Sequence, residues 1–122
     1  MKMRLKLSAL VIGACLLFTP LPSAKGNFNN GARYLQMKEG ERNIYVMGLH
    51  DSWSYFSDAV YNIVDQRSQT RFDRINRCVS PMSVGQLRAL VDDYVRSDQT
   101  RLRYNMGSNF DTALGEKCTP QR

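Results

Sequence analysis

The chain has 122 residues, of which 17 are Lys or Arg and 11 are Asp or Glu, for a formal net charge of +6, a length that accommodates one small domain. Three of the basic residues lie among the first six, so residues 25–122 carry a net charge of only +3, from 14 basic and 11 acidic side chains. Such a modest charge argues against a nucleic-acid-binding protein.

Residues 1–24 have the pattern of a secretory signal peptide. A basic start (MKMRLK) precedes a twelve-residue apolar run (LSALVIGACLLF) and a segment of turn-forming and small residues (TPLPSA). We expect cleavage after Ala24 and export to the periplasm. In an alternative interpretation, residues 12–15 (IGAC) form a lipobox and Cys15 is lipidated. The apolar run is shorter than the roughly 20 residues of a membrane span, so no stable membrane span is expected.

Two cysteines, Cys78 and Cys118, remain after the signal peptide. An even pair in an exported chain is expected to form one disulfide in an oxidising compartment. The sequence contains no C-x-x-C motif and only one histidine, His50. A zinc site normally takes four Cys, His or acidic ligands, so we expect no metal and no cofactor.

The rest of the sequence predicts helices and no sheet, because no segment alternates apolar and polar residues with period two for long. Residues 25–31 (KGNFNNG) are expected to form a flexible leader, followed by a short helix over 32–38 and a long helix over 44–65. Residues 66–77 (QRSQTRFDRINR) are interpreted as a loop or a frayed helical turn. The long helix is predicted from a stripe with steps of three and four residues: Tyr45, Leu49, Ser52, Phe56, Ala59 and Ile63.

A further helix is predicted after Ser83. Ser83 and Gln86 have the spacing of a capping box, and Met82 and Leu87 have that of a hydrophobic staple. The apolar positions of this helix place Asp92 and Asp93 on its outer side.

The last predicted helix is capped by Asp98 and ends at Gly115, with Cys118 just beyond it. It forms a hairpin with the preceding helix, and the two cysteines lie at the outer ends of that hairpin. The fold class is therefore all-α, a small compact bundle of about four helices with one disulfide. The domain spans 32–118, and 119–122 form a tail.

The stretch GLHDSW (48–53) contains the three side-chain types of a hydrolytic triad. It lies within the predicted long helix, where successive side chains point about 100° apart. His50, Asp51 and Ser52 therefore diverge and cannot form a relay in which each side chain orients the next. We expect no catalytic residue and no enzyme activity. Gly48 and Ser52, small and four residues apart, are instead interpreted as a face that a neighbouring helix approaches.

The segment 66–77 contains four arginines and a single acidic residue, Asp73. Such a segment can bind phosphates, an acidic protein partner or anionic lipid, or it can simply be a solvated loop. The candidate partner-binding residues are Arg67, Arg71, Phe72 and Arg74, with Phe72 as the apolar anchor.

Three stretches together resemble the Rap/Tai immunity family, small exported proteins that neutralise type VI secretion amidase effectors. These stretches are YVMGLHD (45–51), CVSPMSVGQLRALVDDYV (78–95) and FDTALGEKC (110–118). The resemblance covers about residues 31–118. The matching positions, besides Cys78 and Cys118, are Tyr45, Gly48, Asp51, Pro81, Gln86, Leu87, Ala113 and Leu114.

The resemblance implies an all-helical periplasmic immunity protein. Such a protein binds a peptidoglycan amidase of the Cys-His type, blocks its substrate groove by a protruding loop or helix, and is a possible homodimer. The sequence departs from the family in lacking an additional cysteine pair and in having Ser97-Asp98 where a His-Pro-like step is usual. The alternative is an exported helical structural or chaperone-like protein without a dedicated effector.

Overall fold

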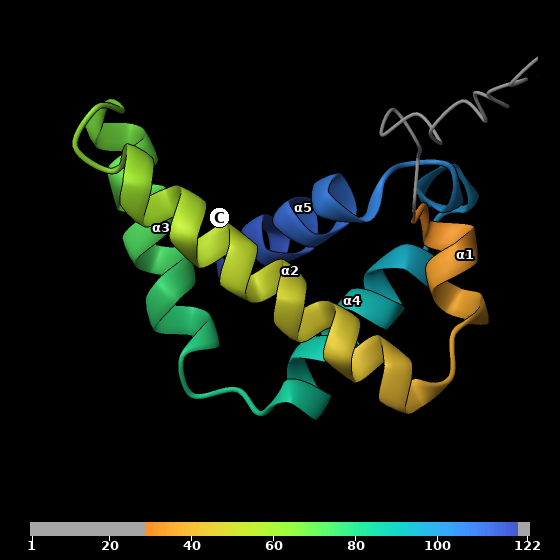
Figure 1. Cartoon of the computed structure of the whole chain (residues 1–122). Coiled ribbons are helices and arrows are strands. Elements are labelled where there is room, and N and C mark those ends of the chain that lie inside the picture. Colours follow the sequence, from red (N-terminus) through yellow and green to blue (C-terminus); the bar gives the residue numbers. More distant parts are fainter. Residues whose placement is uncertain (1–28, 120–122) are drawn as a thin grey trace, which may run out of the picture.

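The computed structural model describes residues 29–119, and the elements in this range are helices (Figure 1). They are α1 (Gly31–Gln36), α2 (Glu39–Val60), α3 (Gln66–Val79), α4 (Val84–Arg96), the 3-10 helix η1 (Gln99–Leu102) and α5 (Met106–Cys118). Residues 29–119 contain no strand, and the predicted all-α fold with one disulfide is confirmed. The predicted signal peptide, Cys15 and most of the tail lie outside the described residues.

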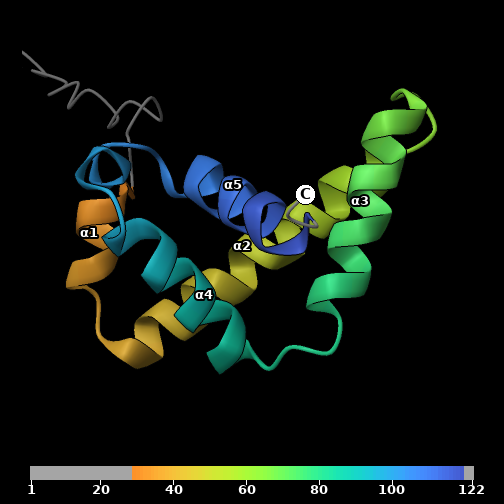
Figure 2. The same cartoon turned by 180° about the vertical axis from the view of Figure 1, so that it is seen from behind.

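Helix α5 occupies the middle of the fold, where it packs against α1, α2, α3 and α4. Both views show α2 crossing the molecule, with α3 returning from one of its ends and α1 and α4 lying near the other (Figures 1 and 2). Phe110 and Leu114 of α5 are fully buried in the hydrophobic core. Within residues 29–119, no helix combines the length and the apolar character needed to cross a bilayer.

The prediction of a loop over 66–77 is wrong, because these residues belong to helix α3. The Asp65 side chain caps this helix by accepting a hydrogen bond from the Ser68 backbone N–H at 2.8 Å. Phe72, Ile75 and Val79, spaced by three and four residues, form its buried stripe. The sequence did not indicate this stripe because polar and charged residues fill the first half of the segment. The cap was also not recognised, because Asp65 was expected to belong to the preceding helix.

The predicted long helix is present, but its boundaries and its buried face differ. Helix α2 begins at Glu39 and ends at Val60, and the residues buried on it are Val46, Trp53 and Ser57. Phe56 and Ile63, which belong to the predicted stripe, are 58% and 82% exposed. Apolar residues occur on several sides of this helix, so periodicity alone did not identify the side that meets the core.

The interpretation of Gly48 as a helix-contact residue is also wrong. Gly48 and Ser52 are exposed, and a Cβ atom added at Gly48 would meet nothing within 4 Å. The close approach occurs at Gly31 instead, where a Cβ atom would lie 2.5 Å from the Arg101 carbonyl oxygen. Gly31 therefore lets α1 pack closely against η1.

The capping box of α4 is confirmed. The Ser83 hydroxyl accepts from the Gln86 backbone N–H at 3.2 Å, and the Gln86 side chain accepts from the Ser83 N–H at 2.8 Å. Asp93 is exposed as expected, but Asp92 is 1% exposed and faces the interior. The predicted outer position of Asp92 is therefore wrong.

The last predicted helix is two helices. Asp98 caps only the short helix η1, and α5 begins after Asn105, whose side chain accepts from the Ser108 N–H at 2.8 Å. Helix α5 continues through Gly115 to Cys118, so the predicted end at Gly115 is also wrong. The Cys118 side chain forms a disulfide with Cys78, and the two Cα atoms are 5.7 Å apart. The disulfide joins the ends of α3 and α5.

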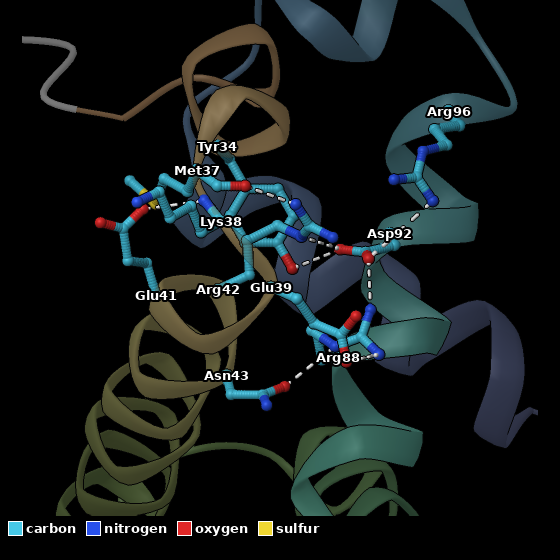
Figure 3. Close-up of polar contacts among 10 residues, drawn as sticks. All are labelled: Tyr34, Met37, Lys38, Glu39, Glu41, Arg42, Asn43, Arg88, Asp92 and Arg96. Carbon is cyan, nitrogen blue, oxygen red and sulfur yellow. Dashed lines mark hydrogen bonds and ion pairs between the residues drawn. The ribbon is translucent and has the colours of Figure 1, made fainter.

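Asp92 is the centre of a buried polar cluster that joins α1, α2 and α4 (Figure 3). One carboxylate oxygen accepts from the Tyr34 hydroxyl at 2.7 Å and lies 3.2 Å from Arg42 Nε. The other accepts from Arg88 at 2.7 Å, and Arg96 approaches it to 3.9 Å. Burial, followed by the hydrogen bond to Asp92, raises the pKa of the Tyr34 hydroxyl well above its usual value, so this hydroxyl donates at neutral pH.

Replacement of Asp92 by asparagine is expected to destabilise the fold by about 3–5 kcal/mol, because it leaves buried arginines without their counter-charge. Asp93→Asn, the adjacent exposed position, is the matched control and is expected to change stability by less than about 0.5 kcal/mol. Urea unfolding at pH 7 measures both. Equal effects of the two substitutions would contradict the role assigned to Asp92.

Replacement of both Cys78 and Cys118 by alanine is expected to lower the free energy of unfolding by roughly 3–4 kcal/mol, because the disulfide closes a loop with a sequence separation of 40 residues. Denaturant unfolding of the oxidised protein and the double variant measures this difference. Reduced wild-type protein serves as the control and is expected to match the variant. A loss below about 1 kcal/mol would show that the disulfide contributes little.

Candidate partner-binding surface

The second half of α2 and helix α3 form a hairpin whose turn, residues 61–65, projects away from the other helices in both views (Figures 1 and 2). Side chains hold this turn in place. The Gln69 amide donates to the Tyr61 carbonyl at 2.8 Å, and the Tyr61 hydroxyl donates to Asp73 at 2.9 Å. The hydrogen bond to Asp73 raises the pKa of the Tyr61 hydroxyl.

Asp111 of α5 fixes the base of the hairpin by contacting both of its helices. One carboxylate oxygen accepts from the Trp53 indole N–H at 3.0 Å, and the other accepts from Arg71 at 2.9 Å. The Trp53 and Phe72 rings also meet edge to face, with their centroids 6.0 Å apart. A hollow of about 380 Å³, lined by Trp53, Phe56, Ser68, Arg71, Phe72 and Asp111, lies at this junction.

Three large apolar side chains are exposed on or beside the hairpin. Tyr55 is 77% exposed, and Phe56 and Ile63 also lie mainly in solvent. Phe56 lines the hollow together with Arg71, which places an exposed aromatic ring near a guanidinium group. Exposed apolar groups clustered with arginine are typical of protein-binding surfaces.

The four candidate residues from the sequence occupy different environments on α3. Arg67 is exposed, Arg71 is held by Asp111, and Arg74 is half-buried. Phe72 is 8% exposed and belongs to the core, so it does not offer the expected apolar anchor. Tyr55, Phe56 and Ile63 supply exposed apolar groups instead. None of these three was a candidate from the sequence, because large apolar side chains of the predicted long helix were expected in the core.

The positions that carry the family resemblance do not converge on one site. Leu87, Ala113 and Leu114 are buried, and Gln86 completes the cap of α4. Tyr45 packs against Tyr34 with ring centroids 5.8 Å apart. Gly48, Asp51 and Pro81 are exposed. Most of these positions therefore support helix packing and capping.

The GLHDSW stretch lies in the middle of α2, as expected. His50 Nδ1 is 3.8 Å from Asp51 Oδ1, which is too long for a hydrogen bond. Among residues 29–119, no three His, Cys, Asp or Glu side chains are grouped so that they could hold a metal ion.

Comparisons of the chain with protein-family models, with curated proteins and with solved structures found no match.

Removal of the cap at the start of α3 is expected to loosen the hairpin. The Ser68 backbone N–H, followed by its hydroxyl, lowers the pKa of Asp65. A lowered pKa in the folded state stabilises the protein above the unfolded value near 3.8, and this stabilisation is lost as the pH falls through the folded value. Asp65→Ala is therefore expected to lower Tm at pH 7, with a difference from wild type that shrinks below pH 3.8.

Thermal unfolding between pH 2.5 and 7 measures this dependence, with Asp58→Ala as the control. Asp58 is exposed near the end of α2 and caps no helix with its side chain. A difference between Asp65→Ala and wild type that stays constant over the whole range would contradict the capping role.

Proposed function

We propose that this chain is a periplasmic immunity protein that binds a type VI secretion peptidoglycan amidase and inhibits it by steric occlusion. The observation that carries this proposal is the projecting α2–α3 hairpin (Figures 1 and 2), which carries exposed apolar side chains as well as the arginines of α3. The resemblance of residues 31–118 to the Rap/Tai family supports the choice of partner.

The hairpin is suited to binding because intramolecular contacts fix its conformation in the absence of a partner. Hydrogen bonds within the turn and the contacts of Asp111 at the base restrict its movement. A preorganised element loses less conformational entropy on association than a flexible loop does. Of the two elements that the resemblance implies, a protruding loop or a protruding helix, the hairpin corresponds to the helix, because residues 66–79 are helical.

The surface chemistry of the hairpin divides into two contributions. Tyr55, Phe56 and Ile63 supply apolar area, which is the main source of affinity in a desolvated interface. Arg67 and Arg74 supply positive charge that favours encounter with an acidic rim around the partner's substrate groove. Inhibition in this proposal needs no chemistry from the chain itself, since the hairpin excludes substrate by occupying the groove.

The disulfide is consistent with the proposed compartment. Cys78 and Cys118 are within bonding distance in the folded chain, and such bonds persist mainly in oxidising compartments such as the periplasm. A signal peptide over residues 1–24 would deliver the chain there.

One observation favours the alternative of an exported chaperone-like or structural protein. Exposed apolar side chains are not confined to the hairpin, because Ile44 and Met47 near the start of α2 are also exposed. A long apolar face can bind unfolded segments without selecting one partner.

Co-purification tests the two functions. The full chain is expressed with its signal sequence in its host while type VI effectors are produced, and it is then captured under non-reducing conditions. If the proposal is correct, an amidase co-purifies with the chain in a near-equal molar amount. That amidase must lose its ability to release amino groups from purified peptidoglycan when one equivalent of the chain is added. Recovery of many unrelated proteins, or of none, would instead favour the alternative.

Alanine replacement of Tyr55, Phe56 and Ile63 together is expected to weaken binding to the amidase at least about 30-fold, equivalent to about 2 kcal/mol. Tyr104→Ala is the matched control and is expected to leave the affinity unchanged, because Tyr104 is an exposed aromatic in the connection between η1 and α5, outside the hairpin. Charge reversal of Arg67 and Arg74 is expected mainly to slow association, and more at low salt. Equal affinities of the triple variant and wild type would show that the hairpin is not the interface.

A further inference from the structure

A second hollow, of about 350 Å³, lies between α2 and the connection from α3 to α4. Met47, His50 and Met82 all line it. We infer that this hollow is a binding site for a soft monovalent metal ion, Cu(I), with two thioether sulfurs and one imidazole nitrogen as ligands. This inference is independent of the proposed immunity function.

The three proposed ligands come from two separate parts of the chain that line the same hollow. Met47 and His50 are three residues apart on α2, so they are neighbours on the helix surface. Met82 comes from the connection that leads into α4 and lines the same hollow. Met47 is 51% exposed and the His50 side chain is 34% exposed, so an ion can reach both without unfolding of the protein.

The chemical types of the three proposed ligands favour Cu(I) over other metal ions. Thioether sulfur is a soft ligand that favours Cu(I), and imidazole also binds copper, whereas Mg²⁺ and Ca²⁺ require oxygen ligands. A structural zinc site takes four ligands from Cys, His and acidic residues, and no group of three such residues is present among residues 29–119. Cys78 and Cys118 are bonded to each other, so their sulfurs do not compete for the ion as thiolates.

The surroundings of the three ligands fit this use. The Asp51 carboxylate also lines the hollow, and its negative charge attracts a bound cation. Val79, Val84 and Leu87 form apolar walls of the hollow. Apolar walls limit access of water to a bound ion.

Silver ion, Ag⁺, serves as the probe because it shares the charge and ligand preference of Cu(I) and does not undergo redox chemistry in air. The protein is purified from the periplasm with its disulfide formed, and its methionine methyl groups are labelled with ¹³C. Titration with AgNO₃ is expected to reach an end point at one equivalent. The methyl resonances of Met47 and Met82 are expected to shift, while those of Met37 and Met106 stay in place.

Each of three substitutions is expected to weaken Ag⁺ binding at least about tenfold: Met47→Leu, Met82→Leu and His50→Gln. Anaerobic titration with Cu(I) is expected to rank the affinities of wild type and variants in the same order. Met37→Leu is the matched control, because Met37 lines a separate hollow beside the start of α2 whose lining contains no histidine. Circular dichroism verifies that each variant is folded.

Three results would overturn the inference. The first is the absence of saturable binding by folded, oxidised protein. The second is an affinity that His50→Gln leaves unchanged, since methionines alone then account for binding. The third is an equal loss of affinity in Met37→Leu, which would show that Ag⁺ binds exposed thioethers without a defined site.

Discussion

A single buried carboxylate, Asp92, sets the arrangement of the N-terminal half of the fold. It receives the Tyr34 hydroxyl from α1, Arg42 from α2, and Arg88 from its own helix (Figure 3). A buried charge without partners is strongly unfavourable, so α1 and α2 are held to the one arrangement that satisfies it. That arrangement determines which side of α2 faces solvent.

The exposed surface of α2 contributes residues to both proposed binding sites. The half of α2 near the hairpin carries Tyr55 and Phe56, and the earlier half carries Met47 and His50. Since the Asp92 cluster anchors the start of the helix and Asp111 anchors its Trp53, α2 is fixed at two points. Both proposed surfaces therefore include residues of one helix whose position is fixed near its start and at Trp53.

The sequence predicted local features well and long-range ones poorly. The Ser83–Gln86 capping box and the helical class were readable because they depend on neighbouring residues. The burial of Asp92 was not readable, because its partners Tyr34 and Arg42 are 58 and 50 positions away in the chain. For the same reason Phe56 was placed in the core and Phe72 on the surface. The sequence named the arginines of residues 66–77 as candidates, whereas the exposure of Tyr55, Phe56 and Ile63 became visible only in the structure.

The position of the disulfide also limits how far the chain can open at its last described helix. Cys118 lies in the last turn of α5, and Phe110 and Leu114 of the same helix are buried in the core. Segments near the end of a chain are usually the first to fray. Because Cys118 is bonded to Cys78 of α3, the end of α5 cannot separate from α3 even when the noncovalent contacts between the two helices loosen.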